Sequence, residues 1–228
     1  MTTTSPASFA SERERIARNL AEVHDAVRNA GRDPASVRIV CVTKTFSIGV
    51  ANAAVAAGLT HLGENYFDEL RDKVPVSPDG ACWHYLGALQ SNKIARIAAL
   101  SNVISGVSRT KELERLSDVS FGGSIDVQVD TTELAQRNGA SPRDVRDLVA
   151  RARALGLHVR GLMTVAPPNP EGARQAFATV AALADDLGLI ERSMGMSEDY
   201  QLACAYGATE LRLGRLLLGP RTPTANVP

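Results

Sequence analysis

Lys44 is the residue whose type and position suggest chemistry most directly. It follows the apolar, partly β-branched run Arg38–Val42, which is typical of a buried strand. A lysine at the end of such a strand is partly desolvated, which favours the neutral amine that attacks an aldehyde. A solvated loop lysine has the same local sequence, so Lys44 alone leaves both interpretations open.

Two segments near the C-terminus have the composition of a phosphate site. Ser193-Met194-Gly195-Met196-Ser197 follows the seventh expected strand, and Arg212-Leu213-Gly214-Arg215 ends the eighth. Ser193 supplies a hydroxyl, while Gly195 and Gly214 let backbone N–H groups approach an anion closely. In an eight-stranded barrel these two loops form the common phosphate site, and Lys44 would face it from the first strand. Taken singly, each glycine is also consistent with a simple turn.

Other catalytic arrangements have less support in the sequence. Glu64 and Asp130 both fall near strand ends, which leaves a glycosidase as a remote alternative. The sequence contains neither a Walker loop nor a Gly-x-Ser-x-Gly nucleophile elbow. We expect no metal site, because metal-ligand spacing is not found among the histidines and cysteines, which are His24, His61, His84, His158, Cys41, Cys82 and Cys204.

The elements that must position Lys44 alternate along the chain as strand and helix. This alternation indicates βαβ units and a parallel sheet, and eight such units close as a barrel. An open doubly wound sheet is the alternative, but its Gly-x-Gly-x-x-Gly turn is replaced by Thr43-Lys44-Thr45 after the first strand. The expected strands are Arg38–Val42, Thr60–Gly63, His84–Gly87, Asn102–Val107, Ser124–Val129, His158–Val165, Leu189–Met194 and Glu210–Leu213.

An additional helix is expected before the first strand. Ser11-x-x-Glu14 has the form of a capping box, and apolar residues follow at helical spacing until Gly31. The sequence therefore predicts a flexible N-terminus over residues 1–10 and a single α/β domain over 11–228. We expect that domain to be a (β/α)8 TIM barrel with an extra N-terminal helix.

Composition restricts the classes of partner. The 25 basic and 25 acidic side chains balance, so binding of nucleic acid or of a membrane surface has no electrostatic support. The Thr/Ser-rich start is unlike a signal peptide, and no stretch approaches the length of a membrane span. Together with three widely separated cysteines, these features predict a cytoplasmic protein.

Several motifs resemble those of the pyridoxal phosphate homeostasis proteins, whose barrel is similar to the N-terminal domain of alanine racemase. The match runs in order from Val40 to Gly219. The motifs that carry it are Val42-Thr43-Lys44-Thr45, Gly63-Glu64-Asn65-Tyr66, Trp83-His84-Tyr85-Leu86-Gly87, Leu89-Gln90-Ser91-Asn92-Lys93, Gly161-Leu162-Met163-Thr164, Ser193-Met194-Gly195-Met196-Ser197-x-Asp199 and Arg212-Leu213-Gly214.

The resemblance implies a role for each matching residue. It implies that pyridoxal 5′-phosphate (PLP) is held as a Schiff base on Lys44 and that Arg212 faces the pyridine nitrogen, which keeps that nitrogen unprotonated. Arg215 stands where a phosphate-binding threonine is common, so it either strengthens phosphate binding or crowds the phosphate. Ala88 and Ser108 also depart from the family pattern. The implied cofactor-binding residues are Lys44, Asn65, Met163, Ser193, Gly195, Arg212, Gly214 and Arg215.

Two functions follow from this resemblance. The first is a non-catalytic carrier that buffers PLP or delivers it to PLP-dependent apoenzymes, as a monomer or weak dimer. The second is a minimal PLP-dependent amino-acid racemase or lyase, which needs a proton-transfer group on each face of the substrate. Tyr66 is the tyrosine expected nearest the barrel mouth. Only nine residues follow Gly219, so we do not expect the additional β-domain that supplies the second base in alanine racemase.

Overall fold

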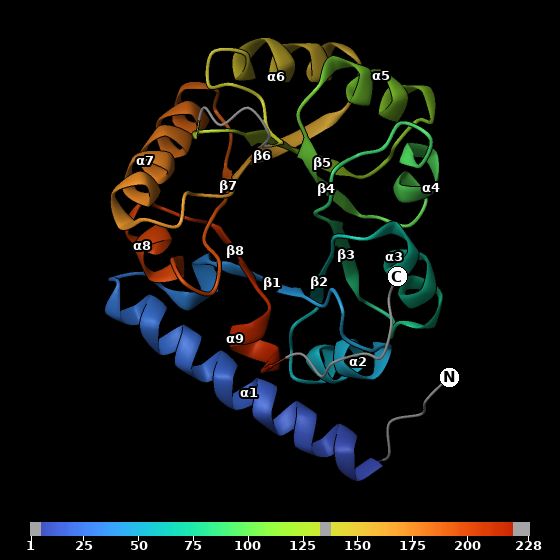
Figure 1. The fold of residues 1–228 in the computed structure, drawn as a ribbon, viewed down its shortest axis with the longest axis vertical. Coiled ribbons are helices and arrows are strands. Elements are labelled where there is room, and N and C mark those ends of the chain that lie inside the picture. Colours follow the sequence, from blue (N-terminus) through green and yellow to red (C-terminus); the bar gives the residue numbers. More distant parts are fainter. Residues whose placement is uncertain (1–5, 133–137, 221–228) are drawn as a thin grey trace.

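The strands of the protein close into a barrel. The computed structural model describes residues 6–132 and 138–220, and it orders the strands from β1 to β8 with β8 paired back onto β1 (Figure 1). All the pairings are parallel; Arg38 of the first strand, for example, lies opposite Glu210 of the last. The predicted (β/α)8 barrel is therefore confirmed. Its strands are β1 (Arg38–Val42), β2 (His61–Glu64), β3 (Cys82–Tyr85), β4 (Val103–Val107), β5 (Ser124–Val129), β6 (His158–Thr164), β7 (Glu191–Ser193) and β8 (Glu210–Leu213).

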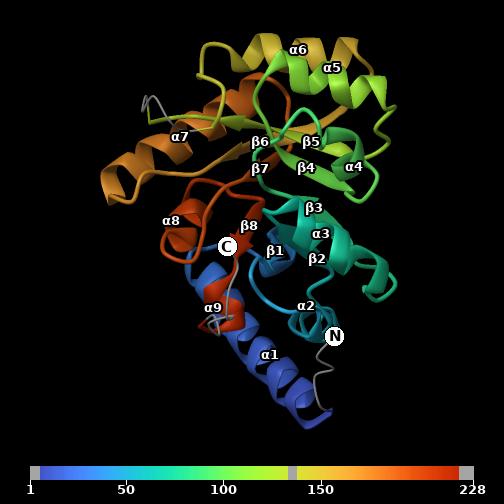
Figure 2. The same cartoon turned by 45° about the vertical axis from the view of Figure 1, so that its right-hand side comes forward.

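Helices surround the barrel and bury their apolar faces against it (Figures 1 and 2). Helix α7 illustrates why they form: the Asn169 side chain accepts a hydrogen bond from the N–H of Gly172, Pro170 takes the first helical position, and Phe177 is fully buried. The helices are α1 (Pro6–Asn29), α2 (Ile48–Ala56), α3 (Phe67–Lys73), α4 (Ile94–Ala98), α5 (Thr110–Asp118), α6 (Val145–Ala154), α7 (Pro170–Asp186), α8 (Tyr200–Ala205) and α9 (Arg215–Leu218), with 3₁₀ turns at Pro34–Ser36 and Val74–Val76.

The additional helix α1 is present, but it begins earlier than predicted. It starts at Pro6, so the capping box predicted at Ser11 is wrong, and residues 6–10 of the segment expected to be flexible belong to the helix. Proline suits a helix start because its missing N–H would have no partner there. Residues 1–5 of the predicted flexible segment lie outside the described residues.

Helix α1 packs against the end of the barrel chain. Its buried face contains Ile16, Val23 and Val27. From the same helix, Arg15 donates to the carbonyl of Leu218 at 2.8 Å and Asn19 to that of Leu217 at 2.9 Å. These bonds satisfy carbonyls at the C-terminal end of α9, so the first and last described helices are joined (Figure 1).

Predicted and observed strand bounds agree for three of the eight strands. The predicted bounds of β1, β5 and β8 are those of the structure, whereas β7 is shorter than the predicted Leu189–Met194. The N–H of Leu189 donates to Ala184 and so belongs to the end of α7, and Ile190 is exposed. The apolar character of this segment therefore serves the turn as well as the strand.

The parallel barrel brings the carboxyl ends of all its strands to one mouth. Lys44 follows β1 and Gly214 follows β8, and these strands are hydrogen-bonded neighbours. The fold therefore places both residues at the same end of the barrel. Among the described helices, none has the length and apolar character that crossing a membrane requires.

Candidate functional site

A cavity of about 970 Å³ lies at the carboxyl end of the barrel. Loops after β1, β2, β6, β7 and β8 contribute to its wall, as expected for a barrel of this class. The structure brings together most of the predicted binding residues there, but Ser193 and Gly195 are not part of the lining. The predicted residues that line it are Lys44, Asn65, Met163, Arg212, Gly214 and Arg215.

Lys44 occupies a tight turn at the end of β1. The N–H of Phe46 donates to the carbonyl of Thr43 at 3.0 Å, which closes the turn around Lys44 and Thr45. Thr45 has a φ of +67°, a conformation that a β-branched residue rarely adopts. Its N–H donates to Glu69 Oε2 at 2.8 Å. The side chain of Glu69 thus holds the unusual backbone beside Lys44.

Lys73 fixes the same turn from α3. Its buried Nζ donates to the carbonyl of Thr43 at 2.9 Å, to Glu64 Oε1 at 2.6 Å and to Glu69 Oε2 at 2.7 Å. Burial raises the pKa of Glu64, and the nearby Lys73 opposes that shift. Lys73 is a positioning residue that the sequence analysis missed. The four-residue spacing of Glu69 and Lys73 on α3 was the available signal.

Arg212 enters the cavity from β8 in a fixed orientation. Its Nη1 donates to the carbonyl and hydroxyl oxygens of Ser193 at 2.6 and 2.9 Å, and its Nη2 donates to the carbonyl of Thr164 at 2.6 Å. Burial lowers the pKa of Arg212, while the carboxylates of Glu210 and Asp126 oppose this shift. A guanidinium held on two strands presents one defined edge to a ligand.

Ser193 has a supporting role in this structure. Its side chain is fully buried and donates to Glu210 Oε1 at 2.8 Å while accepting from Arg212. The hydroxyl that was expected to face a phosphate therefore does not line the cavity in this structure. The physical reason is the alternation of a strand: Ser193 is the last residue of β7 and points into the barrel interior, below the cavity.

The loop after β7 reaches the cavity through Ser197 instead. Ser197 is half-buried in the lining, and the N–H of Met196 beside it donates to Asp199 Oδ1 at 2.6 Å. Burial raises the pKa of Asp199, whereas its hydrogen bond from Met196 lowers it. Ser197 belongs to the Ser193–Ser197 motif but is not among the predicted binding residues. The signal was its position in the loop rather than on the strand.

Gly195 shapes this loop rather than lining the cavity. It has a φ of +95°, and a Cβ there would lie 2.7 Å from Ala203 Cβ and 2.9 Å from Leu211 Cδ2. Only glycine combines this conformation with such close packing. Gly195 therefore allows the β7–α8 loop to fold tightly enough to place Ser197.

Gly214 and Arg215 form the wall beside β1. A Cβ on Gly214 would lie 3.2 Å from the carbonyl oxygen of Val42, so glycine keeps this corner of the cavity open. Arg215 is exposed at the rim and pairs with Glu198 at 3.4 Å. Its side chain is 63% exposed, so the guanidinium lies in solvent at the rim and not in the buried part of the cavity.

The remaining predicted residues line the other walls. Asn65 follows β2 and is half-buried, and Met163 of β6 is almost fully buried. Gly87 is required behind Asn65, because a Cβ there would lie 2.0 Å from the Asn65 carbonyl oxygen. These side chains supply one amide and one thioether to the cavity.

The cavity does not support two alternatives from the sequence, Tyr66 as a proton-transfer residue and a glycosidase. Tyr66 is 55% exposed and outside the cavity lining, whereas Tyr200 of α8 is part of it. Neither Glu64 nor Asp130 belongs to the lining, so the pair required by a glycosidase is not assembled in the cavity. What the cavity does offer is an amine, a buried guanidinium and a hydroxyl beside a glycine. These groups together suit a small phosphorylated ring that carries an aldehyde.

Comparison with known proteins agrees with this geometry. The family model of the alanine racemase N-terminal domain matches residues 12–222. The pyridoxal phosphate homeostasis protein of Deinococcus radiodurans is 40% identical over 204 residues, which are 87% of this chain and 96% of that protein. PipY of Synechococcus elongatus, solved with PLP bound, has a TM-score of 0.76 and 32% identity over 90% of this chain and 100% of PipY.

A more distant structure shares the fold alone. Alanine racemase from Corynebacterium glutamicum is 16% identical, with a TM-score of 0.72 over 94% of this chain and 63% of the racemase. The resemblance predicted from Lys44 and the motifs around it is confirmed by these comparisons. This chain belongs to the alanine racemase N-terminal domain family and, within it, to the pyridoxal phosphate homeostasis proteins.

Proposed function

We propose that this chain binds PLP in the cavity at the carboxyl end of the barrel, as a Schiff base on Lys44, and buffers or delivers it without catalysis. The observation that carries the proposal is that Lys44, Arg212 and Ser197 line one cavity beside Gly214. PLP bound to PipY and the names of the relatives support the choice of ligand.

Lys44 supplies the amine. Its Nζ condenses with the aldehyde carbon, forming a C=N bond and releasing one water molecule, so the linkage reverses by hydrolysis. The turn that carries Lys44 is held by Glu69 and Lys73. This support reduces the freedom of the amine and favours a single attachment geometry.

The phosphate is assigned to the corner between the loops after β7 and β8. Ser197 donates its hydroxyl there, in place of Ser193, and Gly214 leaves room for oxygens to approach the backbone. Arg215 adds positive charge at the rim. The donor set therefore fits a phosphate monoester without rearrangement of the buried Ser193.

The ring is assigned to the space between Asn65, Met163 and Arg212. A guanidinium donates hydrogen bonds and cannot accept one from a protonated pyridine nitrogen, so it favours the unprotonated ring. Arg212 is anchored by Thr164 and Ser193 and cannot withdraw easily. An unprotonated ring is a weaker electron sink, which favours holding the cofactor over carbanion chemistry.

We infer a carrier because racemisation needs a second proton-transfer group opposite the lysine. Tyr200 is the tyrosine of the cavity lining, so it replaces Tyr66 as the candidate in the alternative function, a minimal racemase or lyase. PLP-dependent apoenzymes are the proposed recipients. The three cysteines are free thiols, which suits the proposed cytoplasmic location. A monomer or weak dimer remains our expectation.

The test combines transfer with turnover. The purified protein is loaded with PLP and mixed with a PLP-dependent apoenzyme, whose recovered activity reports delivery. In parallel, racemisation and decarboxylation of common amino acids are measured. We expect delivery without turnover, and Lys44→Ala to abolish the Schiff-base absorbance that Lys93→Ala retains. Robust turnover that disappears in both Lys44→Ala and Tyr200→Phe would contradict the carrier function and show that the protein is a racemase or lyase.

A further inference from the structure

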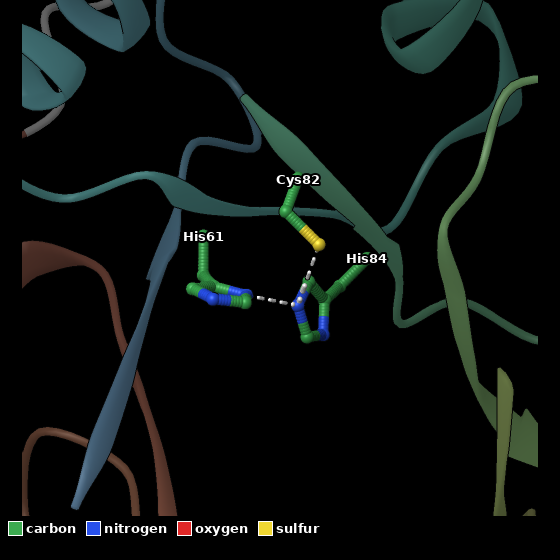
Figure 3. A group of neighbouring side chains, drawn as sticks. All are labelled: His61, Cys82 and His84. Atoms are coloured by element: carbon green, nitrogen blue, oxygen red, sulfur yellow. Dashed lines mark hydrogen bonds between the residues drawn. The ribbon is translucent and has the colours of Figure 1, made fainter. Parts of the chain in front are cut away.

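Three side chains at the amino end of the barrel point toward one another (Figure 3). His61 Nδ1 lies 2.9 Å from His84 Nε2, and Cys82 Sγ lies 3.8 Å from the same His84 nitrogen. One ligand atom from each residue lies within 4.8 Å of the others. We call these residues, His61, Cys82 and His84, the floor cluster. It lies at the end of the barrel opposite the cavity that contains Lys44.

The parallel register explains why these residues meet although their linear spacing shows no metal motif. His61 begins β2 and lies directly opposite Cys82, which begins β3. His84 follows two residues later on β3 and therefore points to the same face as Cys82. Spacing along the chain predicted no metal site, because the pairing of β2 with β3, and not linear spacing, brings these residues together.

A second observation points to a ligand on His84. Its side chain is fully buried, and Nδ1 has no hydrogen-bond partner among the described residues, although Glu210 Oε2 lies 4.0 Å away. A metal on Nε2 would fix the hydrogen on Nδ1, where it faces that carboxylate. A carboxylate behind a metal-binding imidazole is the common outer-shell arrangement, because it orients the ring and increases its basicity.

The charges around the floor cluster tolerate a cation. Arg38 pairs with Glu191 at 2.7 Å and with Glu210 at 3.4 Å, while Arg160 pairs with Asp126 at 2.7 Å and with Glu210 at 2.8 Å. The two guanidiniums are thus opposed by three carboxyl groups. We call these residues, Arg38, Asp126, Arg160, Glu191 and Glu210, the floor network.

We propose that His61 Nδ1, Cys82 Sγ and His84 Nε2 bind one Zn²⁺ ion, with water as the fourth ligand. Tetrahedral zinc with nitrogen at ~2.0–2.1 Å and sulfur at ~2.3 Å separates its ligand atoms by roughly 3.3–3.6 Å. The observed separations of 2.9 and 3.8 Å bracket that range, and the third pair of ligand atoms lies within 4.8 Å, so side-chain rotations without a change of backbone could bring the three together. His61 and Cys82 are half-buried, which leaves a route for the ion and for the water.

Binding changes the protonation of the floor cluster in a defined way. The thiol of Cys82 loses its proton to the solvent and binds as thiolate, since only the thiolate is a strong zinc ligand. Both imidazoles bind as neutral rings, and a proton on Nδ1 of His61 moves to its Nε2. Each ion therefore releases one proton and connects β2 to β3 at the amino end of the barrel.

The test is zinc binding by the reduced, metal-free protein, measured by competition with a chromophoric chelator, with Co²⁺ as the spectroscopic probe. We expect one ion per chain and a thiolate-to-cobalt charge-transfer band. Cys82→Ser should remove the band, and both Cys82→Ser and His61→Asn should weaken zinc binding at least ~100-fold. The matched controls Cys204→Ala and His158→Asn should retain both signals.

Circular dichroism identifies the variants that fold. If Cys82→Ser does not fold, His61→Asn, which changes a half-buried side chain, still tests the proposal. The proposal is overturned if the wild-type protein binds no zinc at one ion per chain. It is equally overturned if folded Cys82→Ser and His61→Asn bind zinc as tightly as the controls do. Neither result depends on PLP, because Lys44 and its cavity lie at the other end of the barrel.

Discussion

The two ends of the barrel use polar side chains in opposite ways. At the carboxyl end, Lys44 and Ser197 line an open cavity of about 970 Å³. At the amino end, the charged side chains of the floor network pair with one another. Glu210 accepts hydrogen bonds from Arg38, Arg160 and Ser193. The same fold thus pairs its charged groups with one another at one end and keeps ligand-binding groups available at the other.

Arg212 connects the two ends. It lines the cavity, yet it donates to Ser193, whose hydroxyl donates in turn to Glu210 of the floor network. The orientation of the guanidinium at the ligand thus depends on a buried carboxylate one layer below. Changes confined to the floor network should affect stability first and the cavity second, whereas changes at lining residues outside this chain of hydrogen bonds, such as Ser197, should affect ligand binding alone.

The largest expected effect is on the floor network. Burial pushes the pKa of Glu210 upward, but Arg160 and His84 outweigh it and lower that pKa to about 2, so the residue is ionised. Glu210→Gln leaves Arg160 with a weaker partner and should reduce the free energy of unfolding by roughly 3–5 kcal/mol in urea denaturation. Glu191→Gln, at a partly exposed position, is the control and should cost much less. Equal losses would contradict the central role of Glu210.

The next effect separates the lining from the layer below it. Ser197→Ala should weaken PLP binding by about 1.5–3 kcal/mol, tenfold or more, while changing the affinity for unphosphorylated pyridoxal little. Ser193→Ala should weaken the binding of both ligands by the same factor, because it removes a hydrogen bond that orients Arg212 and no contact with the phosphate. Fluorescence or absorbance titrations with both ligands measure the ratio. If Ser193→Ala instead weakened the binding of PLP much more than that of pyridoxal, the phosphate contact would have to be assigned to Ser193.

A smaller effect concerns the pH dependence of the amino end. Burial lowers the pKa of His84 from 6.5 to about 3. The unfolded chain therefore binds the extra proton between these values, so stability is complete above pH 6.5 and falls as the pH decreases toward 3. His84 should contribute a slope of at most about 1.4 kcal/mol per pH unit, measured by denaturation with a chelator present. His84→Gln should flatten the profile; an unchanged slope would show that His84 is not the titrating group.

The smallest effect is expected at the rim of the cavity. Arg215 is exposed and its pair with Glu198 is solvated, so each charge contributes at most about 1 kcal/mol. Arg215→Thr, which restores the residue common in the family, should change PLP affinity less than about fivefold in a titration. A loss comparable with that of Ser197→Ala would place Arg215 on the phosphate itself.

The fold was largely predictable because strands buried on both faces form continuous apolar runs. β1, in which Arg38 is followed by the apolar run Ile39–Val42, has the predicted bounds for this reason. The start of α1 was not predictable from Ser11, since a capping-box pattern also occurs inside helices. Pro6 was the better signal, and Phe9 shows why the extra turns form: it packs against the core.

The site was predictable only as far as local sequence decides it. Lys44 and Gly214 follow strands, so topology alone brings them to one mouth. Ser193 and Ser197 share one motif, and only the strand end distinguishes the inward residue from the loop residue. Lys73 and the floor cluster depend on contacts between elements, which linear spacing does not encode.

The central claim is that Lys44 is the attachment point for PLP. The chain has four lysines. Lys73 is buried, and its Nζ donates hydrogen bonds to Thr43, Glu64 and Glu69. Lys93 lies over the Phe67 ring, and Lys111 is exposed on α5.

The most direct measurement is borohydride reduction of the PLP-loaded protein followed by peptide mass mapping. Reduction converts the C=N bond into a stable amine, so the modified residue keeps the pyridoxyl group. If Lys44 is the attachment point, we expect one modified lysine per chain, at Lys44, and no label in Lys44→Ala. A label on Lys73, Lys93 or Lys111, or none at all on the loaded wild-type protein, would contradict it.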